Sequence, residues 1–358
     1  MLSNKGIDVP ARLFISSLFF GTGWFSLSFV FPLLAQEIGY SYVVRGILGF
    51  IAALPFPFVA YIYLRSGPKM LRYGSLVPLL SLTVLSAIFY FFFRPLFIPL
   101  TVTASIVQAP WWIATEISIG SFSGHRNAEK YSAGWGIPNA IAPIFMGVIL
   151  EYTGYELVFV IAMVAFIIAA VFSPKPGVFR ETKGKSTVKM PFMLSLFFAG
   201  LFSGFVYFVM EPVLKANNFS YLVIGGMASI YGLVSAIGYI LLHYAKDHRI
   251  STYSALSGIL IFPTAFIGLS INLYTVLFAV ILAGFGVSIS MSKVLAYITD
   301  SSNIRKGVFL YEAFFATGFM TGSLAQDVLF QFYGRLTIFI LFLLPLLYGI
   351  WVLFVKDQ

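Results

Sequence analysis

Long apolar runs follow one another along the whole chain, separated by short groups of charged residues, Pro, Gly and Asn. Each run is about eighteen to twenty-five residues long, the length that a helix needs to cross a membrane. The runs are continuous and do not alternate with polar residues, so they predict helices and not the strands of a barrel. The division between the fifth and sixth runs depends on the short stretch "EYTGYE". We place twelve spans at 12–35, 42–64, 74–93, 96–121, 132–153, 155–173, 191–213, 221–244, 252–270, 272–298, 307–332 and 336–355.

The composition agrees with a polytopic, all-α membrane protein. Of the 358 residues, 59% are hydrophobic and 10% are charged, whereas ordinary globular proteins carry about 25% charged residues. A soluble domain could not bury so much apolar surface. The chain contains no Cys, which excludes a disulfide framework and a Cys metal site. The first residues, "MLSNKGIDVPARLF", lead into the first run without a small-residue cleavage site, so we expect a retained helix and not a signal peptide.

The positions of Lys and Arg predict the orientation in the membrane. When the loops are assigned alternately to the two sides, 17 of the 22 basic residues fall on one side. Short cationic loops are retained in the cytoplasm. We therefore expect a multi-pass protein of the cell membrane with both termini in the cytoplasm. The net charge of +9 is explained by this topology, and no nucleic-acid partner is needed to account for it.

The chain divides into two similar halves. The longest polar loop, "PKPGVFRETKGKSTVKM" at 174–190, lies near the midpoint and predicts a linker between an N-terminal bundle at 1–173 and a C-terminal bundle at 191–358. A shift of about 180 residues pairs Ser41 and Tyr42 with Ser220 and Tyr221, and Gly154 with Gly334. Six spans are an even number, so the bundles are predicted to run parallel, with a site between them near the middle of the membrane.

These features resemble the major facilitator superfamily over essentially the full length of the chain. The loop after the second span in that family reads Gly-x-Leu-x-Asp-Arg-x-Gly-Arg-Arg, and here 60–69 reads "AYIYLRSGPK". Arg65, Gly67 and Lys69 match the pattern, while Leu64 replaces the acid that helps this loop to stabilise one conformational state in the family. The stretch "APIFMG" at 142–147 matches half of a motif found in the fifth span of antiporters of the family. The resemblance implies a monomeric secondary transporter.

Three ionisable residues are predicted well inside the membrane at one depth. Glu116, Lys293 and Glu312 each lie on the order of 10 Å from the cytoplasmic ends of their helices. Lys293 and Glu312 lie on consecutive spans, so a direct pair between them is the simplest structural interpretation. Our hypothesis is that Glu116 approaches Lys293 across the two halves in one state of a transport cycle. A separated carboxyl would then take up a proton, which couples transport to proton movement.

Three further charged residues are expected near the outer surface. Arg45 begins the second span, and Glu211 and Asp327 lie towards the ends of the seventh and eleventh spans. Long side chains at such positions extend to the membrane interface. We therefore expect these residues to reach water and not to take part in the transport site.

A stripe of polar and aromatic residues points to an organic solute. Gln108, Trp112 and Glu116 are spaced by four on one face of the fourth span, while Trp111 is turned away towards lipid or a neighbouring helix. An amide, an indole and a carboxylate suit a flat or cationic compound, although packing alone also explains Trp112. The residues expected to face this stripe, each of which packing could equally explain, are Trp24, Asn139, Tyr207, Tyr231, Thr317 and Thr321.

The sequence thus predicts a proton-coupled secondary transporter that exports aromatic or cationic compounds by alternating access. An uptake permease for a sugar or another nutrient is an alternative, and so is a transport-inactive sensor or scaffold. We predict no enzyme, cofactor or metal site, because His125, His243 and His248 lie in loops without metal-ligand spacing, and no phosphate-binding loop occurs. The expected partners are a small-molecule substrate, the proton and membrane lipid.

Overall fold

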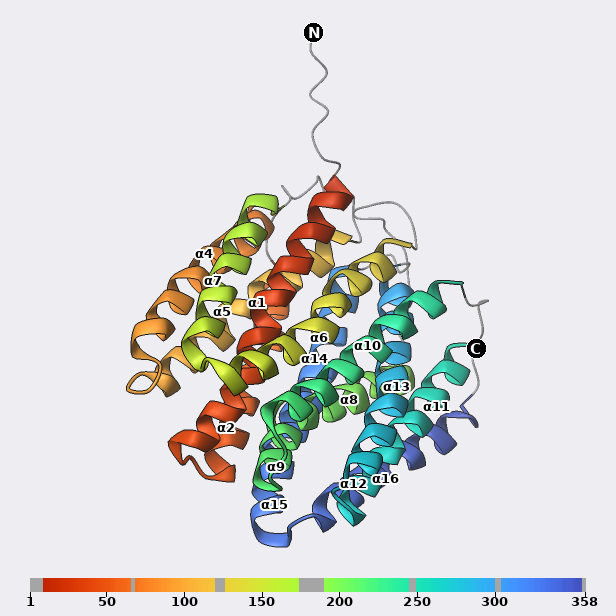
Figure 1. The fold of residues 1–358 in the computed structure, drawn as a ribbon. Coiled ribbons are helices and arrows are strands. Elements are labelled where there is room, and N and C mark those ends of the chain that lie inside the picture. The colour runs from red at the N-terminus through yellow and green to blue at the C-terminus, as the bar shows by residue number, and fades with distance from the viewer. Residues whose placement is uncertain are drawn as a thin grey trace.

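The computed structural model describes residues 9–65, 68–119, 126–173, 190–244, 249–299 and 304–355, and helices are the only regular elements in these ranges. Figure 1 shows them as long rods arranged in two bundles. The helices of the first bundle are α1 (Val9–Ile38), α2 (Tyr42–Ala53), α3 (Pro55–Arg65), α4 (Pro68–Phe92), α5 (Phe97–Ile119), α6 (Arg126–Tyr152) and α7 (Tyr155–Phe172). Those of the second are α8 (Met190–Phe205), η1 (Val206–Met210), α9 (Glu211–Ala216), α10 (Tyr221–Tyr244), α11 (Ile250–Ile261), η2 (Phe262–Thr264), α12 (Ala265–Leu269), α13 (Leu273–Thr299), α14 (Ile304–Met320), η3 (Thr321–Ala325), α15 (Gln326–Tyr333) and α16 (Leu336–Val352).

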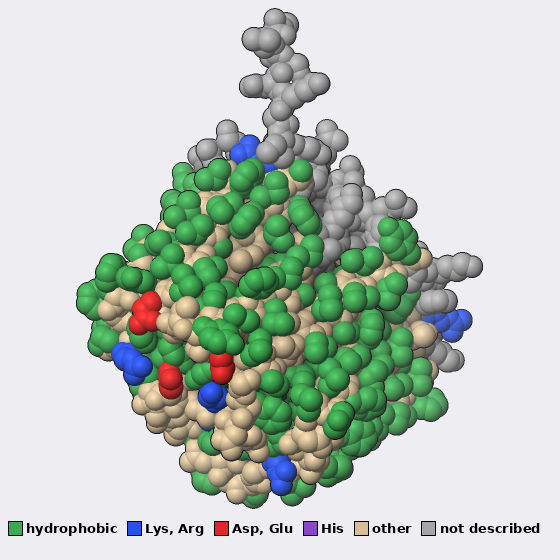
Figure 2. Space-filling model, viewed as in Figure 1, with side chains coloured by type: hydrophobic (Ala, Val, Ile, Leu, Met, Phe, Trp, Pro, Cys, Tyr) green, Lys and Arg blue, Asp and Glu red, His purple; other side chains and the backbone are tan. Residues whose placement is uncertain are grey.

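The described helices reproduce the predicted spans. Ten segments are long and apolar enough to cross a membrane, and two shorter apolar helices, Glu156–Phe172 and Leu336–Val352, coincide with the sixth and twelfth predictions. Four spans consist of consecutive helical elements: α2–α3, α8–η1–α9, α11–η2–α12 and α14–η3–α15. Hydrophobic side chains cover most of the face drawn in Figure 2, as expected for helices that contact lipid.

The turns support the internal repeat. Among the described residues, a positive φ occurs at Gly39, Gly154, Asn218 and Gly334. These four positions form two pairs about 180 residues apart, and each lies just after the end of a helix, at a positive φ that Gly adopts without steric cost. Gly154, with φ of 100°, separates α6 from α7 and confirms the division predicted at "EYTGYE". Ser41 and Ser220, which the repeat also pairs, both accept hydrogen bonds from backbone N–H groups three residues later.

The two bundles meet along two seams. In one seam α6 packs on α10, and in the other α2 and α3 pack on α14, η3 and α15. The first seam is very close: a Cβ atom on Gly225 would meet the Pro143 carbonyl, and one on Gly147 would lie 2.6 Å from the Tyr221 carbonyl. Pro143 and Gly147 belong to the "APIFMG" stretch, so its residues have a packing role between the halves.

Arg45, Glu211 and Asp327 do not reach the membrane interface, so that expectation was wrong. Their exposed fractions are 3%, 0% and 0%. The physical reason is that Arg45 and Asp327 lie where α2 packs on α15, and Glu211 lies on α9, which packs on α1. The sequence did not predict the direction in which these side chains point.

Several predictions fall on residues whose structure is not described. The linker predicted at 174–190 lies outside the described residues except for Met190, and so does Gly67. Lys69 lies at the start of α4, but its side chain is not among those described. Arg65 ends α3, where its guanidinium lies 4.6 Å from the ring centroid of Tyr61.

Candidate functional site

A cavity lies between the two bundles. Ligand sites in proteins are typically clefts of this kind, lined mostly by apolar and aromatic side chains with a few polar groups. Helices of both halves contribute to its wall, including α1, α5 and α6 on one side and α8, α10 and α14 on the other. Eight of the residues predicted from the sequence line the cavity: Trp24, Gln108, Trp112, Glu116, Asn139, Tyr207, Tyr231 and Glu312.

Hydrogen bonds hold the predicted stripe on α5 in place. The Gln108 amide nitrogen donates to the Ala52 carbonyl at 3.3 Å, and its oxygen accepts from Trp112 Nε1 at 3.2 Å. The amide therefore fixes the indole of Trp112 against one wall of the cavity. Trp111 points elsewhere and stacks on Phe20 of α1, with ring centroids 3.7 Å apart. The helical period separated the two adjacent tryptophans correctly.

The opposite wall joins the two halves directly. The Tyr207 hydroxyl in η1 donates to Asn139 Oδ1 in α6 at 2.7 Å. Deeper in the C-terminal half, the hydroxyl groups of Ser203 and Tyr231 lie 3.2 Å apart. Polar groups on this wall are thus hydrogen-bonded to one another, which is how buried polar groups are normally stabilised.

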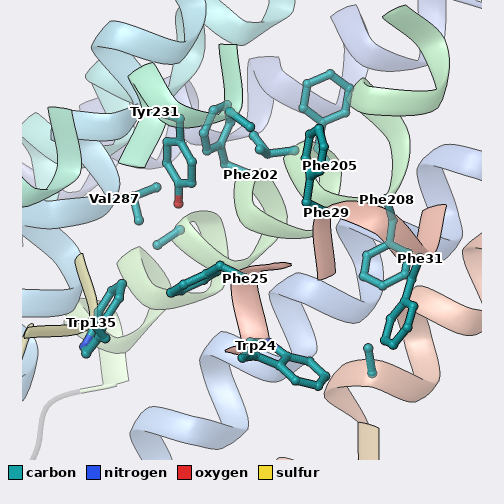
Figure 3. Packing of buried hydrophobic residues seen from close by; sticks show 14 of the residues in the cluster. Trp24, Phe25, Phe29, Phe31, Trp135, Phe202, Phe205, Phe208, Tyr231 and Val287 are labelled. Atoms are coloured by element: carbon teal, nitrogen blue, oxygen red, sulfur yellow. The ribbon is translucent and has the colours of Figure 1, made fainter. Parts of the chain in front are cut away.

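Most of the remaining wall is aromatic, and the sequence did not single out these residues. Phe25 stacks on Tyr207, with ring centroids 6.2 Å apart, and Phe319 stacks on the same tyrosine at 6.3 Å. Trp135 meets Trp112 edge to face at 6.0 Å. Figure 3 shows Trp24, Phe25 and Trp135 near one another in this region. The chain contains 40 Phe residues, so the sequence does not show which of them line a cavity. Trp135 lies at the predicted depth of Glu116 and could have been identified as a cavity residue.

Two carboxyl groups from different halves meet at the cavity. Glu116 of α5 and Glu312 of α14 are 6% and 3% exposed, and their carboxyl groups lie close enough to interact with each other. A hydrogen bond between two carboxyl groups needs a proton on one of them, because ionised carboxylates only accept. Among the described residues that line the cavity, none is Lys, Arg or His.

Lys293 contacts neither glutamate partner that the sequence suggested. Its ammonium donates to the Leu242 carbonyl at 3.0 Å and lies 5.2 Å from the ring centroid of Tyr253. Lys293 therefore faces α10 and α11 within its own half. In the state described, Lys293 therefore pairs with neither Glu312 nor Glu116, because equal depth does not determine which way a side chain points around its helix. The approach of Glu116 to Lys293 in another state of the transport cycle stays a prediction.

Thr317 and Thr321 do not line the cavity either. Thr317 is exposed on the outside of α14, and the hydroxyl groups of both residues donate to the carbonyl four residues earlier. Phe315, Ala316 and Phe319 occupy the cavity side of this helix. The prediction was wrong because both threonines lie on the face of the helix that points away from Glu312.

No metal centre is indicated: the described residues contain no group of three or more His, Cys, Asp or Glu that could hold an ion. Comparison with known proteins identifies a fold and not a sequence relative, since no family model matches the chain and no curated protein does. Its structure is similar to that of the human organic anion transporter MFSD10 (TETRAN), with a TM-score of 0.67 and 16% sequence identity. The match covers 95% of this chain and 98% of that one.

Proposed function

The chain has the major facilitator fold, and from that premise we propose that it is a secondary active transporter of a small aromatic or cationic compound, coupled to protons. The observation that carries this proposal is the cavity between the halves, with its aromatic wall and the contact between Glu116 and Glu312. In such a fold the site between the bundles becomes accessible from each side in turn as the bundles move relative to each other.

The chemistry of the wall favours a flat cation. Indole and phenol rings attract a positive charge over their faces, and Trp112, Trp135 and Tyr207 supply such rings here. The two glutamates supply negative charge, and no described side chain of the wall is basic. The human neighbour with a similar structure is an organic anion transporter, so this proposal assigns a different substrate charge to the same fold.

Proton coupling follows from the pair of carboxyl groups. When the pair holds one proton, Glu116 and Glu312 can share a hydrogen bond and the halves stay together at this point. When the proton leaves, two like charges repel in an apolar surrounding, unless a cationic substrate takes its place. Proton and substrate therefore compete for the same carboxyl groups, which is the logic of an antiporter and, with an inward proton gradient, of export.

The alternatives receive less support from the same observations. A sugar permease needs many hydroxyl and amide groups around its substrate, whereas this wall is mostly aromatic. A sensor or scaffold without transport has no need of two carboxyl groups buried against each other, since burying charge is costly.

Flux into proteoliposomes tests the proposal. A fluorescent aromatic cation should accumulate in response to a pH gradient, and both E116Q and E312Q should abolish that response while retaining exchange of substrate for substrate. Glu156 is exposed at the start of α7, so E156Q is the matched control and should behave as the unmodified protein. Gradient-driven flux that survives in both E116Q and E312Q would contradict the role of the pair.

A further inference from the structure

Asn139 presents an unused hydrogen-bond donor to the cavity. This residue lies within α6, is 1% exposed and belongs to the wall of the cavity. Its side-chain oxygen accepts from the Tyr207 hydroxyl at 2.7 Å. An amide nitrogen carries two N–H donors, and within the described part of the chain Nδ2 of Asn139 donates to no acceptor. Nor is Nδ2 one of the side-chain atoms that are buried without a partner, so a bound molecule can reach it.

Contacts with the C-terminal half hold this amide in one orientation. The Tyr207 hydroxyl binds Oδ1, which leaves Nδ2 on the other edge of the amide. The Tyr207 ring is itself held between Phe25 and Phe319, with centroid distances of 6.2 and 6.3 Å. The backbone of Asn139 packs directly on α10, where a Cβ atom on Gly232 would meet the Asn139 carbonyl. A donor that is held in place in this way loses little conformational entropy when it binds a ligand.

Three other donors in the wall are engaged within the protein. The hydroxyl groups of Ser28 and Ser105 donate to backbone carbonyl groups of their own helices, at 3.3 and 2.8 Å. The indole nitrogen of Trp112 donates to the side chain four residues earlier. Asn139 differs from these residues, because its oxygen takes part in the internal hydrogen bond and its nitrogen does not. The nitrogen is therefore available to a ligand.

Asn139 lies at a different depth from the glutamates of the cavity. Trp135 lies at the predicted depth of Glu116, and Asn139 follows it by four residues, which is about 6 Å along the helix. A compound whose cationic group lies near the glutamates would therefore place a different part of its structure at the amide. An N–H group binds an atom with a lone pair, such as an oxygen, and not a second cation.

We propose that Asn139 donates a hydrogen bond from Nδ2 to an oxygen of the transported compound, and that Tyr207 is a positioning residue for this amide. The substrate class is then an aromatic cation that carries a carbonyl or ether oxygen remote from its charged group. Recognition of this oxygen discriminates against cations of equal size that lack it, because their binding leaves the amide nitrogen unpaired. The inference rests on the proposed function, since it concerns the compound that the cavity binds.

Binding of matched compounds tests the role of Asn139. Trimethyl(para-benzoylbenzyl)ammonium and trimethyl(para-benzylbenzyl)ammonium have the same rings and the same permanent charge, and differ in having a carbonyl or a methylene group between the rings. The meta isomers place that group at another distance from the charge. Isothermal titration calorimetry of the full-length protein in detergent gives the affinity for each compound. The measured quantity is the ratio of the affinity for the ketone to that for its methylene analogue, taken for the isomer with the larger ratio in the unmodified protein.

The preference for the ketone should reverse when the donor is removed. The unmodified protein should bind the ketone at least about threefold more tightly than the methylene analogue, as expected for one net hydrogen bond. N139L has a side chain of similar size but no donor, so the ketone oxygen is buried unpaired, and the methylene analogue should bind at least about threefold more tightly. Y207F leaves the amide free to rotate and should give a ratio between these two. S105A is the matched control in the wall, and should change the ratio by less than about twofold because its hydroxyl is bonded within its own helix.

A ratio in N139L equal to that of the unmodified protein would overturn the role of Asn139. An unmodified protein that binds neither ketone more tightly than its analogue would overturn it as well. An unchanged ratio in Y207F would overturn the positioning role of Tyr207. N139L leaves the Tyr207 hydroxyl without its acceptor; if this variant does not fold, as checked by monodispersity in detergent, N139L/Y207F removes both polar groups together and makes the same prediction.

The outcome is separable from the proposed function. Flux of these cations into proteoliposomes in response to a pH gradient, with equal ratios in N139L and the unmodified protein, contradicts the role of Asn139 alone. A reversed ratio in N139L without flux contradicts the proposed transport alone. If none of the cations binds, the proposed substrate class is wrong, and the inference that rests on it is wrong too.

Discussion

The two halves of the molecule build their equivalent helices differently. In the N-terminal half α1 and α6 run without interruption from Val9 to Ile38 and from Arg126 to Tyr152. Their counterparts about 180 residues later are each interrupted by a five-residue π-helical segment, η1 at Val206–Met210 and η3 at Thr321–Ala325. Such segments are rare and often occur at functional sites. Here η1 carries Tyr207 and Phe208 of the cavity wall.

The packing within each pair of helices also differs. Between α8 and α14, Cβ atoms added to Gly200, Gly204 or Gly318 would meet backbone carbonyl oxygens of the facing helix. Between α1 and α6, a Cβ atom on Gly21 would lie 2.6 Å from the Pro138 ring, and one on Gly134 would lie 3.0 Å from the Phe14 ring. Glycines that bring two backbones together are typical of tight contacts between membrane helices.

This difference indicates a division of roles between the halves. The C-terminal pair is in backbone contact along α8 and α14, and we expect such close packing to hold these two segments together. The π-helical segments η1 and η3 follow α8 and α14 directly along the chain. We expect the helices to bend at these segments. The N-terminal pair has side chains between its backbones and no π-helical segment. Movement of the cavity wall is therefore expected mainly in the C-terminal half.

The largest effect, a loss of stability, is expected when a methyl group is added between the backbones of α8 and α14. Gly318→Ala places a methyl group against the Phe197 carbonyl, and overpacking of this kind costs roughly 1–3 kcal/mol, which exceeds the gain of about 1 kcal/mol in helix propensity. The melting temperature in detergent should fall. Gly134→Ala is the control, because the Phe14 side chain can move aside, and it should leave the melting temperature unchanged or raise it. An equal fall in the melting temperature of both variants would show that the α8–α14 and α1–α6 contacts do not differ in this way.

A smaller effect is expected from removing a π-helical segment. Deleting Thr321 takes out one residue at the start of η3, where its side chain is only partly buried, and should let the helix continue as a regular α-helix. The protein should keep its melting temperature, but transport should slow by about tenfold, because a hinge mutation changes turnover more than stability. Thr321→Ala, which keeps the chain length, serves as the control. Full transport after the deletion would exclude bending at η3.

The sequence predicted the spans well because membrane crossing depends on length and hydropathy, and both are local properties. It also placed Glu116 and Glu312 at one depth, since rise per residue is constant along a helix, and both residues line the cavity. It did not predict that these two acids face each other while Lys293 faces away. That choice depends on the rotation of each helix in the packed bundle, which no pattern within a single span records.

Residue spacing within one helix does show which residues of α14 share the face of Glu312. On a regular helix Thr317 lies about 140° around from Glu312, whereas Phe319 lies within about 20° of it. Phe319 lines the cavity and Thr317 does not. Polarity drew attention to the threonine, although most of the side chains that line this cavity are aromatic. The π-helical segments were not predictable, because the sequences "VYFVM" and "TGSLA" differ in no obvious way from their surroundings.

The smallest effect is expected from a change on the outside of the bundle. It tests whether α6 and α14 turn equivalent faces away from the cavity. The repeat pairs Thr317 with Ile137, and both side chains are exposed on the outside of the bundle. Thr317→Ile should therefore leave both the affinity for a transported cation and the rate of flux unchanged, because the threonine donates only to its own helix. Phe319, paired with Asn139, lines the cavity, so Phe319→Ala removes a ring from the wall and should weaken binding roughly fivefold to tenfold. Weaker binding in Thr317→Ile would mean that α14 turns this face inward during transport, and the equivalence of α6 and α14 would then hold only for the state described.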